Sequence, residues 1–174
     1  MKEGKGMVTV QRLKDFELFK GLTDSDLERI GELCHLHTIH EGDRIFEEAT
    51  RATNLHICCS GKVDIVTWVK KPWNKYVRVH QAQAGEVFGW SALVAPYNYS
   101  ASAICAEDGE EIRIRGIDLL ALLHQQPHIG FTIMQNLAAD IGARLMQMRQ
   151  SLISEWQSAP APTNSSAWGE PKKR

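Results

Sequence analysis

The chain has little of what marks a secreted, membrane-spanning or strongly charged protein. Its 174 residues carry 20 Lys and Arg against 21 Asp and Glu, so the formal charge is −1. That balance excludes bulk basicity as a means of binding nucleic acid or an acidic membrane. No apolar run approaches the roughly 20 residues that span a bilayer, and Met1–Gly6 precedes no apolar stretch typical of a signal peptide. These absences predict a soluble, cytoplasmic protein with no membrane partner, and the length predicts one domain with tails.

Cysteine, histidine and catalytic motifs are also too sparse to indicate a redox, metal or active site. The four cysteines show no C-x-x-C spacing and are interpreted as reduced thiols of the core. On a strand, His35 and His37 would share one face and His40 the other, which favours a polar strand face over a metal site. Nothing in the sequence singles out His80 and Cys105 as a haem-ligating pair. Nucleophile elbow, P-loop and paired catalytic carboxylates are absent, so we predict neither an enzyme nor a metal site.

Helix signals stand near both ends of the chain. Thr23 lies three residues before Asp26, a capping-box spacing, and an apolar face continues from there to about residue 34. Near the other end, the pattern predicts a short helix over Ile117–His124. A long helix is predicted over residues 127–156, with a proline in its first turn.

Between these helices, short runs rich in Val, Ile and Thr alternate with turn residues. The predicted strands are Arg44–Glu47, Asn54–Cys59, Lys62–Val69, Tyr76–Gln83, Ser102–Cys105 and Glu111–Arg115. This even spacing predicts an α+β fold, an antiparallel β-roll or jelly roll flanked by N-terminal helices and a long C-terminal helix. The domain is placed at residues 13–156, after an N-terminal tail of residues 1–12. Residues 157–174, rich in Pro, Ser and Ala, are predicted to form a disordered tail.

The long helix carries an apolar seam with the spacing of a coiled coil. Its members lie four and three residues apart in alternation: Met134, Ala138, Ile141, Leu145, Met148 and Leu152. This period of 3.5 residues is narrower than the apolar face of a globular helix, and it predicts a homodimer through Met134–Leu152. The alternative is a single apolar stripe that packs against the chain's own sheet.

Four short motifs, in this order of elements, resemble the cyclic nucleotide-binding domain family, which includes the catabolite activator protein and the regulatory subunits of protein kinase A. They are Phe19-Lys20-Gly21-Leu22, Glu41-Gly42-Asp43-Arg44-Ile45-Phe46, Ser60-Gly61-Lys62-Val63 and Gly85-Glu86. Each is weak alone, but all four occur in order at the expected separations over residues 13–155. The resemblance implies a regulatory module of this fold, similar to stand-alone bacterial members, with cyclic AMP or cyclic GMP as ligand.

The resemblance also implies a ligand site, the family's phosphate-binding cassette. In the family the cassette begins at Gly-Glu, whose carboxylate accepts hydrogen bonds from the ribose 2′-hydroxyl. A short helix then directs its N–H groups at the cyclic phosphate. Glu86, between Gly85 and Val87, matches that carboxylate, and Trp90–Leu93 matches the short helix. On the long helix, Arg144 matches a second arginine that faces the pocket in the family.

The cassette, residues 85–103, departs from the family at its cation. Aligning Ala101-Ser102-Ala103 with the family's following strand puts Ser100 where an arginine is expected, and no cation lies nearby. A charge-assisted hydrogen bond contributes about 1.5–3 kcal/mol, so its loss weakens phosphate binding roughly 10- to 150-fold. The hydroxyls of Ser100 and Ser102 remain as donors, so we expect a cyclic nucleotide to bind weakly.

Tyr97 and Tyr99 form part of a Pro-Tyr-x-Tyr-Ser pattern that resembles the cassette of some stand-alone bacterial members. They would suit a neutral or aromatic ligand, or they would plug the cavity as lid and core. Two functions therefore stay open. One is a regulatory module that signals to a partner protein by moving its cassette and helices. The other is a degenerate dimeric scaffold that binds no nucleotide. The residues after Trp156 are too few for the family's winged helix-turn-helix, so no DNA partner is expected.

The segment Trp68–Arg78 interleaves aromatic residues and cations. It fits the solvated tip of a hairpin, with Trp68 and Tyr76 paired across two strands. Docking of a partner protein, or stacking of nucleic-acid bases, is the alternative.

Overall fold

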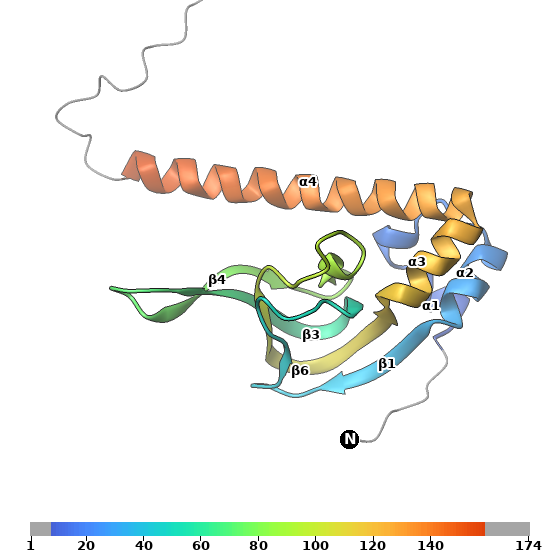
Figure 1. The fold of residues 1–174 in the computed structure, drawn as a ribbon, viewed down its shortest axis with the longest axis horizontal. Helices are drawn as coiled ribbons and strands as arrows, with labels where there is room; N and C mark the ends of the chain where they lie inside the picture. Colours follow the sequence, from blue (N-terminus) through green and yellow to red (C-terminus); the bar gives the residue numbers. More distant parts are fainter. Residues whose placement is uncertain (1–7, 159–174) are drawn as a thin grey trace, which may run out of the picture. The chain divides into compact units, whose positions relative to one another are not determined.

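The computed structural model describes residues 8–158 (Figure 1). They form an antiparallel sheet of six strands, with short helices before it and two helices after it. The elements in chain order are α1 (Val10–Leu13), η1 (Glu17–Phe19), α2 (Asp24–Gly31), β1 (Cys34–Ile39), β2 (Arg44–Phe46), β3 (Asn54–Val69), β4 (Lys75–Ala82), β5 (Val87–Phe88), η2 (Trp90–Ala92), β6 (Ser102–Arg115), α3 (Gly116–Gln125) and α4 (Pro127–Ser158). The sheet has the order β1-β6-β3-β4, with β2 paired to β6 and β5 paired to β3. The predicted fold class is confirmed.

The N-terminal helices begin earlier than predicted. Val8 is buried and α1 starts at Val10, so the domain extends into the predicted tail. Thr23 caps α2 as expected: its Oγ1 accepts from the N–H of Asp26 at 3.3 Å, and the Asp26 carboxylate accepts from the N–H of Thr23 at 3.0 Å. That carboxylate also lies 2.9 Å from Nε2 of His128 on α4, whose hydrogen bond lowers the pKa of Asp26. The cap of α2 is thereby tied to the first turn of α4.

Two long strands replace four of the predicted ones. β3 runs on through Ser60-Gly61 and β6 runs on through Glu107–Gly109, because these segments pair with each other across three register shifts. Gly61 has φ of +74°, and a Cβ there would overlap the backbone oxygen of Glu107. A Cβ on Gly109 would overlap the backbone oxygen of Ser60. The glycines therefore let two backbones approach closely at a bulge instead of turning the chain.

Buried apolar side chains fill the interior of the sheet, in a cluster that includes Cys58 and Cys105. All four cysteines are free, and burial raises the pKa values of the Cys34 and Cys58 thiols to about 12. Thiols with pKa values this high stay protonated at neutral pH, and protonated thiols are poor nucleophiles and metal ligands. Within residues 8–158, no three His, Cys, Asp or Glu side chains come together as a metal site. No helix in the same range has the length and hydrophobicity needed to cross a bilayer.

The long helix α4 belongs to both of the units into which the chain divides, one ending at Asn136 and the other starting at Leu137. In the first unit, Ile129 and Ile133 of α4 are fully buried. The buried stripe is thus different from the predicted dimer seam. In the second unit, α4 continues through Ser158, two residues into the predicted disordered tail; the rest of that tail, like residues 1–7, lies outside the described residues.

Candidate functional site

The first half of the cassette, residues 85–103, is fixed to the middle of β3 by its backbone. Gly85 has φ of +93°, a conformation that glycine adopts without strain. Its N–H donates to the carbonyl of Cys58 at 2.8 Å, and the N–H of Cys58 donates to the carbonyl of Glu86 at 2.9 Å. These two bonds set the position of the Glu86 side chain before any ligand is bound.

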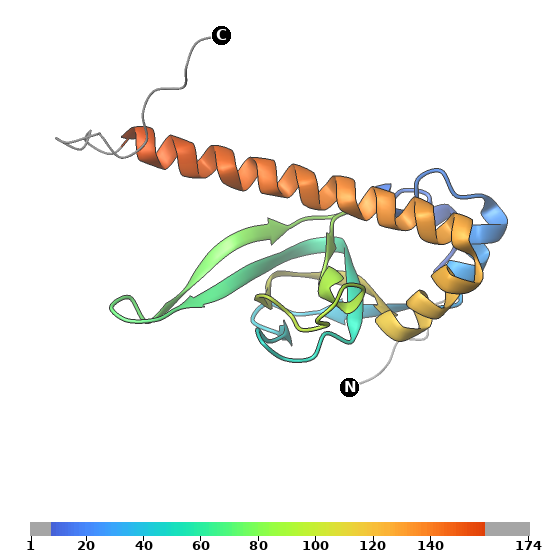
Figure 2. The same cartoon turned by 45° about the horizontal axis from the view of Figure 1, so that its top comes forward.

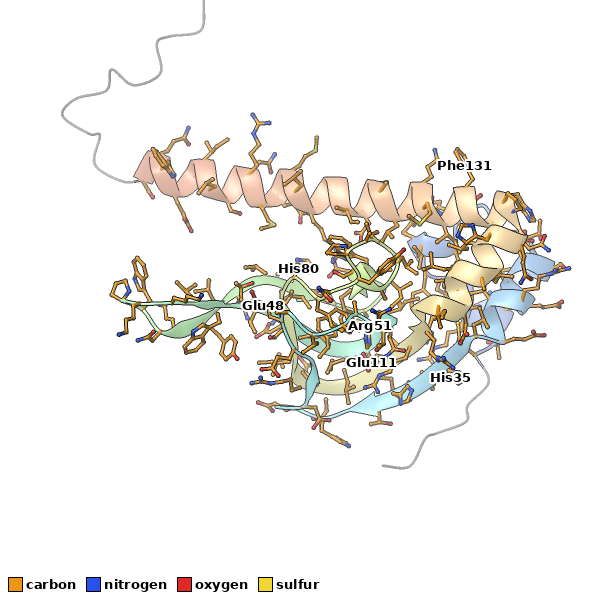
Figure 3. All side chains as sticks on the ribbon, in the orientation of Figure 1. His35, Glu48, Arg51, His80, Glu111 and Phe131 are labelled. Atoms are coloured by element: carbon orange, nitrogen blue, oxygen red, sulfur yellow. The ribbon has the colours of Figure 1, made fainter. Side chains whose placement is uncertain are left out.

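The Glu86 carboxylate lies partly exposed at the edge of the cassette. Its Oε2 accepts a hydrogen bond from the N–H of Gln83 at 2.8 Å. The same oxygen lies 3.3 Å from Nε2 of His80 on β4, labelled in Figure 3, and the Glu86 side chain keeps 35% of its surface exposed. Among the described residues, Oε1 has no hydrogen-bond partner, so one oxygen of the predicted ribose-binding carboxylate remains able to accept from a ligand hydroxyl.

Tyr99 packs inward as part of the core. Its ring stacks on Phe46 with a centroid separation of 3.8 Å and an interplanar angle of 8°. Its hydroxyl accepts from the N–H of Asn54 at 3.2 Å and donates to the carbonyl of Asn54 at 3.0 Å. The backbone of Tyr99 also bonds Ala49 and Thr50 at 2.8 and 2.9 Å. Tyr99 therefore packs in the core and anchors the cassette, and its ring does not face outward toward a ligand.

The neighbours of Tyr99 divide between surface and core. Tyr97, with φ of +59°, is 37% exposed and is thus a surface side chain. Ser100 is exposed and Ala101 half-buried. Ser102 is buried, and its Oγ accepts from the N–H of Glu48 at 2.9 Å. Ser102 therefore holds the connection between β2 and β3, whereas Ser100 is open to solvent. The predicted hydroxyl contacts to a phosphate are thus reduced to Ser100.

The cassette contains no Lys or Arg, but the fold brings Arg51 beside it. Arg51 pairs with Asn98 in an isolated antiparallel bridge, and its side chain is exposed. Arg51 is a residue that the motif comparison missed, because it lies far from the cassette in sequence. The other predicted cation, Arg144, lies in the second unit, where its Nη2 is 2.9 Å from Oδ2 of Asp140. Its contact with a ligand stays a prediction.

A buried polar pair lies directly beneath the cassette. His56 on β3 and Glu111 on β6, the latter labelled in Figure 3, are both buried, and Nδ1 of His56 lies 3.0 Å from Oε2 of Glu111. Nε of Arg113 donates to the other carboxylate oxygen. The His56 ring stacks on Phe88 with a centroid separation of 5.0 Å, and a Cβ on Gly89 would lie 2.8 Å from its Cδ2. Because Gly89 has no Cβ, the turn that leads into η2 can pack directly against the edge of the His56 imidazole.

Burial alone would raise the pKa of Glu111. The hydrogen bond and charge of His56, together with the charge of Arg113, outweigh that effect, so the pKa of Glu111 lies below its usual value. No short motif marks this pair in the sequence, and only one of its two members stands out there. His56 stands between Leu55 and Ile57 and so interrupts an apolar run, whereas Glu111 ends the acidic segment Glu107–Glu111 and does not stand out in the sequence.

The cassette also touches the start of α3. A Cβ on Gly116 would lie 2.6 Å from the carbonyl oxygen of Ala92, the last residue of η2. The N–H of Gly116 donates to the carbonyl of Thr53 at 2.8 Å. Because only a glycine fits here, a movement of η2 toward Gly116 would press on the start of α3.

Comparisons with known proteins agree with this geometry. The sequence profile described as "Cyclic nucleotide-binding domain" matches residues 36–126. A proposed cyclic nucleotide-binding protein from Geobacter metallireducens is 29% identical, with a TM-score of 0.71 over 80% of this chain and 99% of that one. The catabolite activator protein of Thermus thermophilus is 26% identical, with a TM-score of 0.66 over 80% of this chain and 63% of that one.

A more distant structure shares the fold alone. The regulatory domain of protein kinase A from Toxoplasma gondii, solved with cyclic AMP, is 14% identical, with a TM-score of 0.64 over 77% of this chain and 48% of that one. The search of curated proteins gives no match.

Proposed function

Since this chain belongs to the cyclic nucleotide-binding domain family, we propose that it is a cytoplasmic, non-enzymatic regulatory module that binds a nucleotide-like ligand at the cassette. The observation that carries the proposal is the Glu86 carboxylate, which is held by the Gln83 N–H through Oε2 and is 35% exposed. A carboxylate oriented in this way can accept a hydrogen bond from a sugar hydroxyl through Oε1 without further rearrangement.

The ligand we propose is a cyclic nucleotide bound without the family's cassette arginine. Ser100 is exposed at that place, and Tyr99 turns inward onto Phe46. The backbone N–H groups near η2 and the nearby Arg51 remain as partners for a phosphate. Without a charge-assisted bond from the cassette itself, affinity is expected to be roughly 10- to 150-fold below that of an arginine-containing site.

The output we propose is a movement of the cassette that is passed to α3 and from there to a partner protein. The support is the close contact between Ala92 and Gly116: a Cβ on Gly116 would lie 2.6 Å from the carbonyl oxygen of Ala92. A ligand shifts such an equilibrium only by its difference in affinity for the two arrangements. The second candidate function, a dimeric scaffold that binds no nucleotide, is favoured by the buried anchor Tyr99.

Replacing Glu86 with glutamine is expected to weaken the binding of cyclic AMP or cyclic GMP about tenfold, because a hydrogen bond to a charged acceptor becomes one to a neutral acceptor. Isothermal titration calorimetry measures the change. Glu32→Gln, at an exposed carboxylate after α2, is the matched control and should leave affinity unchanged. Absence of heat with either nucleotide on the unmodified chain would favour the scaffold instead. Equal affinities for the Glu86 variant and the unmodified chain would contradict the cassette assignment.

We propose a homodimer through α4, supported by the exposure of its seam. Leu145, Met148 and Leu152 keep 66%, 51% and 56% of their surface exposed, which is costly for a helix that stays single. Leu145→Glu is expected to convert a dimer to a monomer in sedimentation equilibrium, because it places charges opposite each other in the seam. Gln147→Glu, on the same helix but outside the seam, should leave the mass unchanged. A monomeric unmodified chain at micromolar concentration would refute the proposal.

A further inference from the structure

The outer edge of β4 has no neighbouring strand. In the sheet order β1-β6-β3-β4, the described chain pairs β4 with β3 alone. All five residues of Lys75–Val79 are exposed, and Figure 2 shows β3 and β4 extending together beyond the rest of the sheet. An edge strand carries a row of N–H and C=O groups without partners in the sheet, and proteins normally shield such an edge. Here the row is long and uncovered by any strand.

The side chains around this edge are unusually apolar for an exposed hairpin. Trp73 at the tip is 64% exposed, and Val77 and Val79 on β4 are 38% and 39% exposed. Trp68 and Tyr76 meet edge to face across the two strands, with centroids 5.0 Å apart and an interplanar angle of 70°. Apolar residues in this setting are typical of a surface that becomes covered by a partner.

The charged side chains of the hairpin that form no ion pair in the described part of the chain are all positive. Lys70, Lys71 and Lys75 make no ion pair with any residue of the described range, whereas Arg78 lies 3.3 Å from Asp64. The hairpin tip therefore presents three free ammonium groups beside the exposed apolar residues. Their charge calls for an acidic partner.

We propose that the β4 edge and the hairpin tip bind an extended acidic segment of a partner protein by strand addition. Backbone hydrogen bonds along the edge would supply affinity, the valines would contact alternate apolar side chains, and the three lysines would select carboxylates. A second copy of this chain fits poorly, because pairing two β4 edges would bring two positively charged strands together, and β4 itself contains no Asp or Glu. This inference names the chemistry of the partner and does not depend on nucleotide binding.

Single-stranded nucleic acid fits the same charges less well. Base stacking needs open aromatic faces, but Trp68 packs edge-on against Tyr76, and the Arg44 guanidinium lies 5.8 Å from the centroid of the Tyr76 ring. Trp73 is left as a lone stacking surface at the tip. An acidic peptide uses the backbone edge as well as the lysines, and is the occupant that the geometry favours.

The test is a titration of the full-length protein with a fluorescein-labelled, capped ten-residue peptide of alternating Glu and Val, followed by fluorescence anisotropy. The expected result is saturable binding without nucleotide, weakened roughly ten- to thirtyfold by the triple change Lys70→Glu, Lys71→Glu and Lys75→Glu. The control carries the same charge change in the N-terminal segment, Lys14→Glu, Lys20→Glu and Arg29→Glu, and should bind like the unmodified protein. Circular dichroism confirms that both variants are folded.

Hydrogen exchange of the β4 amides distinguishes strand addition from simple charge attraction. Bound Glu-Val peptide is expected to slow exchange at β4 amides, since added strand pairing protects the outward N–H groups. Absence of binding, equal binding of a Lys-Val peptide, or binding that leaves β4 exchange unchanged would each overturn the proposal. Displacement of the peptide by a twenty-nucleotide thymidine strand that binds more tightly would overturn it in favour of a nucleic-acid surface.

Discussion

Replacing Glu111 with alanine is expected to lower the free energy of unfolding by about 3–5 kcal/mol, since removing one member of a buried charged pair leaves its partners uncompensated. The Glu111 side chain has no exposed surface, and its carboxylate bonds both His56 and Arg113. Alanine would leave the buried imidazole and the partly exposed guanidinium without their shared carboxylate, at a cavity beneath the cassette. Urea denaturation at pH 7 measures the change.

The neighbouring residue provides a matched control. Glu110 pairs with Arg12 at 3.0 Å, but both side chains are more than a third exposed. Glu110→Ala is therefore expected to cost less than about 1 kcal/mol, as for other surface ion pairs. Equal effects at the two positions would show that the buried pair contributes nothing special to stability.

The contribution of Glu111 to the free energy of unfolding should also decrease as the pH is lowered. The pKa of Glu111 in the folded chain lies below its ordinary value of 4.5 because His56 and Arg113 outweigh the effect of burial. A carboxylate of this kind contributes stability that is fully present above the unfolded pKa and is lost as the pH falls through the folded pKa. The difference in unfolding free energy between the unmodified chain and the alanine variant should therefore shrink below about pH 4. A difference that grows in acid would mean that the buried carboxyl is held protonated.

Signals from neighbouring residues predicted where several helices begin. The extent of the long strands depends on pairing between remote segments, which such signals do not reveal. The Thr23 cap depends on residues three apart, and the start of α4 depends on the geometry of Pro127, so both were predicted correctly. Ser60-Gly61 carries the same residues as a turn, yet it forms a bulge because Gly109 lies opposite it. That partner is remote in sequence, and no local pattern reveals it. β1 was predicted only as a polar strand face around His35 and His37, without bounds, because its His and Thr residues weaken the apolar alternation.

The site shows the same division between local and remote information. Gly85 and Glu86 were singled out from a short motif, and the positive φ of Gly85 and the hydrogen-bonded carboxylate of Glu86 agree with that motif, while their contact with a ligand stays a prediction. The motif could not show that Tyr99 faces inward, because its ring is positioned by Phe46 on β2. Nor could it show Arg51, which reaches the cassette through a bridge to Asn98.

Placing an arginine at Ser100 is expected to raise the affinity for cyclic AMP or cyclic GMP roughly 10- to 150-fold, which corresponds to one charge-assisted hydrogen bond of about 1.5–3 kcal/mol. The structure favours this position for the change, because Ser100 is exposed whereas Tyr99 is buried and bonds Asn54 through its hydroxyl. An arginine at Ser100 therefore adds a cation beside the cassette without disturbing the stacked pair of Tyr99 and Phe46. Calorimetric titration measures the gain.

A gain caused by a specific phosphate contact must differ from a gain caused by added positive charge. Ser25→Arg, on the exposed side of α2, adds the same charge far from the cassette in sequence and is expected to leave affinity unchanged. Arginine at Ser100 should also favour cyclic AMP over adenosine, which lacks the phosphate, whereas the unmodified chain should discriminate between them less. If affinity for adenosine rises as much as affinity for cyclic AMP, the arginine does not meet a phosphate. In that case the second half of the cassette holds a different part of the ligand from the one that the family places there.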